Sequence, residues 1–293
     1  MHPAPSVILF TTLSGAGFGL LFFLGFDATP PTGWTAFAYF AIGYALGVGG
    51  LLASTFHLGH PERALKAFTQ WKTSWLSREA WASAVALVVM GIHAAGLVFF
   101  GVALQPLGWI GALLALVTVV TTSMIYAQLK SIPRWNDLSV PAMFLSTSLA
   151  GGALLSGRGE LAIVLLVIAG AAQILHWVRG AGAFARAGST IGTATGLGAR
   201  GAVRSFERPH TGTNYLLHEM VYQVARRRAD QLRWIGLALG YVLPVILLLL
   251  PFQHLFAGLA VLAHLAGVMA TRWLFFAEAE HVVGLYYGRT AAG

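Results

Sequence analysis

The segment Val7–Phe26, with the sequence VILFTTLSGAGFGLLFFLGF, decides the fold class of this chain. It contains no charged residue, and an α-helix of about 20 apolar residues crosses the hydrocarbon core of a bilayer. No basic residue precedes it, and the run is longer than the apolar region of a signal peptide. The segment therefore predicts a first transmembrane helix. Its glycines, from Gly15 to Gly19, are better explained by close helix packing than by phosphate binding.

Similar apolar runs follow along the whole chain, which is 57% hydrophobic and only 10% charged. Soluble domains carry about 25% charged residues, so a bilayer explains this composition better than a soluble core. We predict an all-α integral membrane protein, a bundle of about eight transmembrane helices. We expect residues 1–293 to form a single membrane domain, with one long polar loop at 185–231. The predicted spans are Val7–Phe26, Thr35–Phe56, Ala80–Leu104, Leu107–Leu129, Val140–Ser156, Leu161–Phe184, Leu232–Leu250 and Leu255–Phe276.

Positive charge is distributed unevenly between the two sets of connections. The chain has 18 Lys and Arg residues and a net charge of +8, and we assign every one of them except Arg158 to the same side. The positive-inside rule then places both termini and the loop 185–231 in the cytoplasm. Membrane topology explains this charge better than nucleic-acid binding does, and no nucleic-acid partner is predicted.

Cysteine is absent from the chain. This excludes disulfides, thiol catalysis and cysteine-ligated iron–sulfur clusters within this chain. Any iron–sulfur chemistry must therefore lie on a partner protein.

Three clusters of ionisable and aromatic residues fall at the predicted cytoplasmic boundary. The first follows the second span, the next lies between spans four and five, and the third follows the last span. Tryptophan and charged residues at this depth also form ordinary interfacial belts, and this alternative stays open. The members are His57, His60, Glu62, Arg63, Trp71, Lys72, Trp75, Arg78 and Glu79; Tyr126, Lys130, Arg134, Trp135 and Asp137; and Arg272, Trp273, Glu278, Glu280 and His281.

Such a boundary suits a quinone site. The quinone ring and tail enter from lipid, the two carbonyl oxygens need hydrogen-bond partners, and two protons move with two electrons. Histidine can donate, accept and change charge near neutral pH, and a carboxylate such as Glu79 or Glu278 can pass protons onward. If the last helix continues, Glu278 and His281 share one face.

Histidines inside the spans raise the possibility of haem b. His93, His176 and His264 lie on spans three, six and eight, and paired intramembrane histidines can ligate haem. No two spans carry a repeated histidine spacing. We therefore predict that these histidines bond to neighbouring helices and that the chain holds neither haem nor metal.

Two other function classes compete with a quinone site. A transporter would place charged groups at mid-membrane around broken helices, and Pro244 is the only sign of a break in the seventh span. A purely structural anchor without a quinone site is the second alternative.

Long motifs run through the three clusters, from residue 2 to residue 288. They resemble the DmsC-type membrane anchor subunits of molybdoenzymes, a family named for dimethyl sulfoxide reductase. The match covers nearly the whole chain. The segments are HPAPSVILFTTLSGAGFGLLFFLG, ASTFHLGHPERALKAF, WLSREAW, IYAQLKSIPRWND, TGTNYLLHEM and RWLFFAEAEHVVGLYYG.

The resemblance implies an eight-helix bundle without haem, in a complex with an iron–sulfur subunit and a molybdopterin catalytic subunit. Because the three clusters lie on the predicted cytoplasmic face, we expect these partners to dock there. This chain would lack the catalytic centre and carry the quinone site, passing electrons to ubiquinone or menaquinone. A family histidine tied to quinol binding falls on His57, which we expect to bond one quinone carbonyl, and a family acid falls on Glu79. The other expected quinone-site residues are Arg78, Tyr126, Trp135 and Glu278, and the expected proton relay is His60, Arg63 and His281.

One branch of the family, the SoeC-type anchors of cytoplasmic sulfite-oxidising complexes, agrees with the charge asymmetry. We therefore expect a multi-pass protein of the bacterial inner membrane that serves a quinone-linked sulfite dehydrogenase. The alternative within the family is the quinol-oxidising anchor of a dimethyl sulfoxide reductase-like complex.

Overall fold

The computed structural model describes residues 3–57, 60–207, 229–251 and 253–287, and these fold into helices and connections without strands. Four short helical turns, η1 (Ser54–His57), η2 (Pro61–Phe68), η4 (Gly198–Arg200) and η7 (Val282–Tyr287), lie in the connections and after the last helix. The helices are α1 (Pro5–Gly25), α2 (Gly33–Ala53), α3 (Trp75–Ala95) with η3 (Gly96–Phe100), α4 (Gln105–Ala127), α5 (Ser139–Leu155), α6 (Gly159–Gly180), α7 (Ala183–Arg186), α8 (Ile191–Thr195), α10 (Ala229–Leu237), η6 (Ala238–Val242), α11 (Leu243–Leu248) and α12 (Gln253–Ala277).

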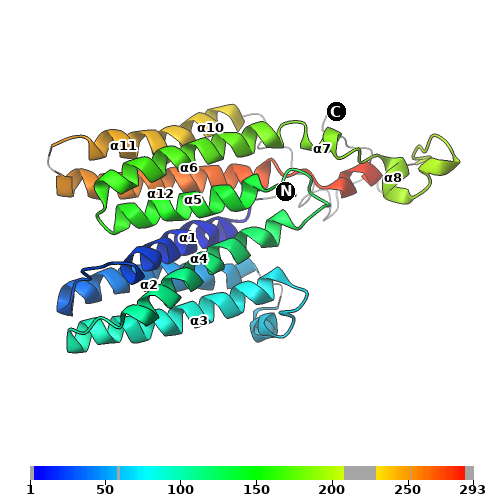
Figure 1. Cartoon of the computed structure of the whole chain (residues 1–293). Helices are drawn as coiled ribbons and strands as arrows, with labels where there is room; N and C mark the ends of the chain where they lie inside the picture. Colours follow the sequence, from blue (N-terminus) through cyan, green and yellow to red (C-terminus); the bar gives the residue numbers. More distant parts are fainter. Residues whose placement is uncertain (1–2, 58–59, 208–228, 252, 288–293) are drawn as a thin grey trace.

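The long helices run side by side in two groups, α1 to α4 and α5, α6, α10–α11 and α12 (Figure 1). Helix α1 packs against α2, α4, α5 and α12, so it joins the two groups. It is also the most enclosed helix, with 67% of its span buried against at most 50% for any other span. The other helices leave apolar side chains on the outside, as lipid contact requires.

Glycine allows α1 to approach its neighbours closely. A Cβ atom on Gly19 would lie 1.9 Å from the Ser148 carbonyl oxygen of α5, and one on Gly17 would lie 2.3 Å from the Gly47 nitrogen of α2. Any larger residue at either position would push the helices apart. The prediction that the Gly15–Gly19 stretch serves helix packing is therefore confirmed.

Seven helices among the described residues are long and apolar enough to cross a membrane. The remaining predicted span, Val140–Ser156, corresponds to α5, which has only 17 residues. Helix α5 nevertheless lies parallel to the others and is packed between α1 and α6. The all-α membrane fold is confirmed, whereas the count of eight spans stays a prediction.

Several predicted boundaries were wrong by a few residues. Helix α3 begins at Trp75 rather than Ala80, because Ser74 caps it by accepting a hydrogen bond from the Ser77 amide. Helix α6 ends at Gly180 rather than near Phe184, because Gly182 adopts the left-handed conformation with φ of +70°. The segment TGTNYLLHEM lies outside the described residues, as does most of the loop between α8 and α10.

The seventh span changes its hydrogen bonding halfway. Pro244 has no N–H to offer the Gly240 carbonyl four residues earlier, and the preceding segment η6 is π-helical. The Nδ1 atom of His264 on α12 lies 2.7 Å from the Gly240 oxygen and supplies the missing donor. The span therefore stays helical through Pro244, with a π-helical turn in place of the break that Pro244 suggested, and a side chain supplies the missing donor.

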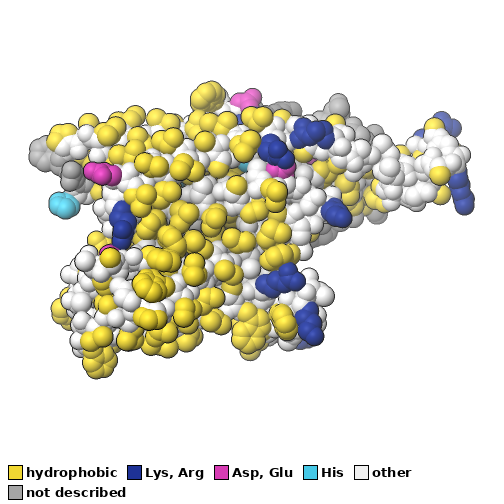
Figure 2. Space-filling view, viewed as in Figure 1, with side chains coloured by type: hydrophobic (Ala, Val, Ile, Leu, Met, Phe, Trp, Pro, Cys, Tyr) yellow, Lys and Arg dark blue, Asp and Glu magenta, His cyan; other side chains and the backbone are white. Residues whose placement is uncertain are grey.

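Basic side chains gather at one end of the bundle, where α7 and α8 lie (Figure 2). Lys130, Arg134, Arg179 and Arg186 belong to this region, which we call the basic end. Helix α1 begins and α12 ends at the same end (Figure 1). Arg158 lies in the α5–α6 connection at the opposite end, where it pairs with Asp27 at 3.0 Å. The structure thus keeps the charge asymmetry seen in the sequence.

Candidate functional site

Glu79 turns its carboxyl group into the bundle near the start of α3 and is only 3% exposed. The Thr122 hydroxyl of α4 donates a hydrogen bond to it, and Tyr126 lies within electrostatic range. No Lys or Arg among the described residues pairs with this carboxyl. Buried acids in membrane helices are costly and usually functional. The buried face of α3 continues through Ser83, Ala86, Met90 and His93.

Arg78, the neighbouring candidate, points to the outside. Its guanidinium stacks on the Trp75 ring at 4.3 Å and donates to the carbonyls of Trp71 at 3.0 Å and Lys72 at 2.8 Å. Consecutive residues on a helix are turned by about 100°, so the two candidates occupy different faces. Arg78 therefore supports the connection before α3 and does not contact Glu79.

Tyr126 and Trp135 are buried in an aromatic cluster at the basic end. The Trp135 ring stacks on Phe275 with centroids 5.0 Å apart, and its Nε1 donates to the Phe275 carbonyl at 3.0 Å. Tyr126 meets Trp135 edge-on at 5.2 Å, and Phe144 and Phe276 complete the cluster. Trp135 is only 2% exposed, so it is a core residue rather than an interfacial anchor.

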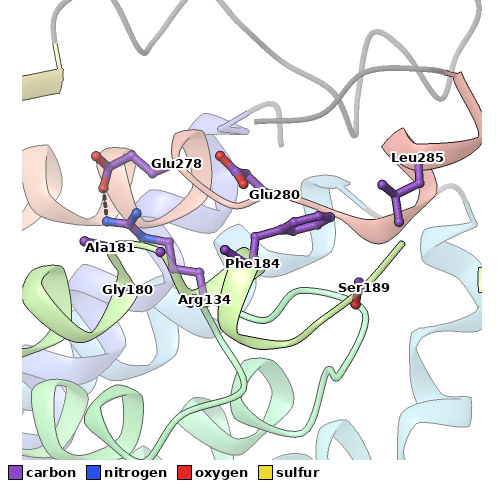
Figure 3. A pocket seen from close by; sticks show the side chains of 11 residues that line it. Arg134, Gly180, Ala181, Phe184, Ser189, Glu278, Glu280 and Leu285 are labelled. Atoms are coloured by element: carbon purple, nitrogen blue, oxygen red, sulfur yellow. Dashed lines mark hydrogen bonds and ion pairs between the residues drawn. The ribbon is translucent and has the colours of Figure 1, made fainter. Parts of the chain in front are cut away.

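Glu278 forms the centre of an ion-pair network directly after α12. Its Oε2 accepts a hydrogen bond from Arg134 at 2.6 Å, and its Oε1 accepts one from Arg233. The carboxylate is 7% exposed. Its two ion pairs join the α4–α5 connection and α10 to the end of α12. Arg134 and Glu278 also line a cavity of about 360 Å³ together with Phe184, Ser189 and others (Figure 3).

The expected proton relay is not assembled around Glu79. His60 and Arg63 lie on the surface, where both contact Glu62, at 2.9 Å and 3.9 Å. Helix α12 ends at Ala277, so Glu278 and His281 do not share a helix face. Burial lowers the pKa of His281, whose Nδ1 accepts from the Val283 amide at 3.0 Å. His57 is the last residue of η1, and its side chain lies outside the described part of the structure.

Asp137 forms a second ion pair at the basic end. Arg179 donates to both carboxylate oxygens, at 2.9 Å to Oδ1 and 2.7 Å to Oδ2, and the Ser139 amide donates to Oδ1 at 2.8 Å. The Arg179 guanidinium holds the pKa of Asp137 well below its usual range. The pair connects α6 to the start of α5.

We expect Asp137→Asn to lower the free energy of unfolding at pH 7 by about 1–2 kcal/mol, because the partly exposed ion pair loses its charge. The folded-state pKa is below the unfolded value, so this stabilisation is present above about pH 4 and is lost at lower pH. Unfolding followed by tryptophan fluorescence at pH 7 and pH 3 tests this. Glu207→Gln, at an exposed site, is the control and should change stability by less than about 0.5 kcal/mol. A pH-independent effect of Asp137→Asn would contradict the assignment.

The three intramembrane histidines bond to neighbouring segments, as predicted. His93 Nδ1 lies 3.0 Å from the Leu104 carbonyl oxygen, and His176 Nδ1 lies 3.0 Å from the Ser139 hydroxyl. His264 bonds to the Gly240 carbonyl of the π-helical segment η6. Each ring therefore has a local structural partner.

Sequence reasoning missed Thr122 and Arg233 and misplaced Arg272. Thr122, the partner of Glu79, is an ordinary threonine of an apolar helix. Arg233 joins the Glu278 network from α10, although it lies at the start of the predicted span Leu232–Leu250 and in none of the three clusters. Arg272 was assigned to the membrane boundary, but the structure buries it to 2% exposure. The available signal was the position of Arg272, five residues before the end of α12 and inside the last predicted span.

Comparisons with known proteins agree with this architecture. Residues 1–278 match the family described as DMSO reductase anchor subunit (DmsC). The chain is 31% identical to the C subunit of the sulfite dehydrogenase of Allochromatium vinosum over an aligned length of 330. The alignment covers 99% of this chain and 100% of that protein. No solved structure matches it. The family match runs from the first residue to the end of α12 and thus spans the whole bundle, so this chain belongs to the DMSO reductase anchor subunit (DmsC) family.

Proposed function

We propose that this membrane anchor holds a quinone site at the basic end of its bundle. Electrons would arrive from a docked iron–sulfur subunit and leave on quinone. The buried carboxyl of Glu79 is the observation that supports this proposal most strongly. It lies near the start of α3 and is buried against α4, where the Thr122 hydroxyl is its hydrogen-bond partner. No cation among the described residues neutralises it.

The chemistry of quinone reduction explains why such a carboxyl is useful. Each quinone takes up two electrons and two protons, and the protons must reach the carbonyl oxygens inside an apolar site. A carboxyl group buried beside the boundary can accept a proton from the cytoplasm and pass it inward. His57 ends the short turn after α2, so the chain brings it to the same end of the bundle as the start of α3. We assign His57 the hydrogen bond to one quinone carbonyl.

The basic end would face the cytoplasm of a bacterial cell, because positive charge is retained on that side of the inner membrane. The iron–sulfur and molybdopterin subunits would dock on this end. Similarity to a subunit of a sulfite dehydrogenase favours a complex that oxidises sulfite to sulfate, which releases two electrons for each sulfite. The two electrons match the requirement of one quinone.

We expect His57→Ala to lower quinone-linked sulfite oxidation by the complex about tenfold or more, because a hydrogen bond of about 1.5 kcal/mol to the quinone is lost. Oxidation of sulfite with an artificial electron acceptor should continue at the normal rate, since that acceptor takes electrons before the membrane anchor. Both rates are measured on the purified complex.

His254→Ala is the matched control, because His254 is exposed at the start of α12, at the opposite end of the bundle. Both rates should stay normal in this variant. Unchanged quinone-linked turnover in His57→Ala would remove His57 from the site. Loss of both activities would indicate a failure of assembly and would also count against the assignment.

A further inference from the structure

A small polar cavity lies inside the bundle, between α1, α5 and α12. The centre of a water-sized sphere has about 10 Å³ of space inside it, so the cavity admits one small particle. Hydroxyl groups, one histidine and one arginine surround it. Its polar lining includes Thr12, Ser148, His264 and Arg272.

Arg272 is a buried cation without a counter-charge among the described residues. It is 2% exposed, its Nε has no hydrogen-bond partner, and it forms no ion pair with any described residue. Its guanidinium carbon lies 3.5 Å from the centre of the Phe144 ring, in a cation–π contact. Burying an arginine without a counter-charge is costly, and this contact offsets only part of the penalty.

The acids nearest in the fold do not neutralise Arg272. Glu278 pairs with Arg134 and Arg233, and Glu79 bonds to Thr122. No acidic residue lines the cavity within the described part of the chain. The described acids therefore leave the charge of Arg272 uncompensated, and a bound anion would balance it.

The other polar groups of the cavity include hydrogen-bond donors. The Thr12 hydroxyl is buried and has no partner among the described residues, and the Ser148 hydroxyl lines the same space. His264 is fixed through Nδ1 to the Gly240 carbonyl, which holds its ring against the cavity wall. Convergent N–H and O–H donors around a cation, without a carboxylate, form a site for an anion.

We propose that this cavity binds a monoatomic anion, chloride in the cell, as the counter-charge of Arg272. Sulfate and phosphate are far larger than the available space, so the site discriminates by size. A halide would accept hydrogen bonds from Arg272, Thr12 and Ser148, and the buried pair would carry no net charge. This assignment does not depend on the quinone site, because none of the residues assigned to quinone binding lines the cavity.

Halide-dependent stability tests the proposal on the purified full-length chain in detergent. At constant ionic strength, replacing gluconate with chloride or bromide should raise the melting temperature by about 3 °C or more. In Arg272→Met, which keeps the volume and removes the charge, the halide effect should fall below about 1 °C. Arg158→Gln removes an arginine at the opposite end of the bundle and should keep the full effect.

Two further measurements keep the proposal testable if Arg272→Met does not fold. Thr12→Val removes one hydrogen-bond donor at nearly constant volume and should weaken halide binding. About tenfold more bromide should then be needed to reach half of the rise in melting temperature. Crystals of the complex soaked in bromide should show anomalous scattering within the cavity. Equal stability in gluconate and chloride, a full halide effect in Arg272→Met, or a water molecule in the cavity at high bromide would each overturn the proposal.

Discussion

Replacing Glu79 with Gln is expected to lower quinone-linked turnover of the complex about 100-fold, while turnover with an artificial acceptor stays normal. Proton transfer by a positioned carboxyl typically contributes about 10²–10⁴-fold, and glutamine keeps the shape of the side chain but cannot carry the proton. The Thr122 hydroxyl can still donate to the amide oxygen, so the helix pair should remain intact. Steady-state rates with quinone and with an artificial acceptor, measured on the same preparation, give the ratio.

Two companion variants separate a proton-transfer role from a structural one. Glu160→Gln changes an acid in the first turn of α6, at the opposite end of the bundle, and both rates should stay normal. Glu79→Asp keeps the carboxyl and should recover part of the quinone-linked rate, which a purely structural role would not predict. If Glu79→Gln retains normal turnover with quinone, the quinone site does not use this carboxyl.

The arrangement of long helices was readable from the sequence because a bilayer imposes one simple requirement. Each span needs about 20 apolar residues, and runs such as Val7–Phe26 meet it over their full length. The start of α3 was missed because Arg78 and Glu79 interrupt its apolar pattern soon after the Ser74 cap. Apolar content does not reveal such a start, whereas a capping residue followed by a periodic pattern does.

The interior of the site was harder to predict than its position along the chain. The sequence places Arg78 and Glu79 side by side, and only the helix register shows that one faces out and the other in. Likewise, Glu278 was grouped with His281 on the assumption of a continuing helix, but α12 ends at Ala277. The actual partners of Glu278 come from segments 45 and 144 residues away in sequence. Contacts of that kind depend on tertiary packing rather than on local pattern.

Glu278→Ala is expected to lower the free energy of unfolding by about 3–5 kcal/mol, since removing one partner of a buried ion pair leaves the opposite charge uncompensated. Here the carboxylate is 7% exposed and accepts from both Arg134 and Arg233. Asp230→Ala provides a closely matched control, because Asp230 pairs with the same Arg233 at 2.9 Å but is 87% exposed. That exposed pair should contribute at most about 1 kcal/mol. Unfolding in detergent, followed by tryptophan fluorescence, measures both.

The pair of variants also tests what Glu278 does in the protein. If its role is to tie the α4–α5 connection to α10 and α12, then Glu278→Ala and Arg134→Ala should not be additive, and a double-mutant cycle should give a coupling energy of about 1 kcal/mol or more. Equal effects of Glu278→Ala and Asp230→Ala would contradict a buried network. A variant that keeps its stability yet loses turnover with quinone would instead indicate that Glu278 acts at the quinone site.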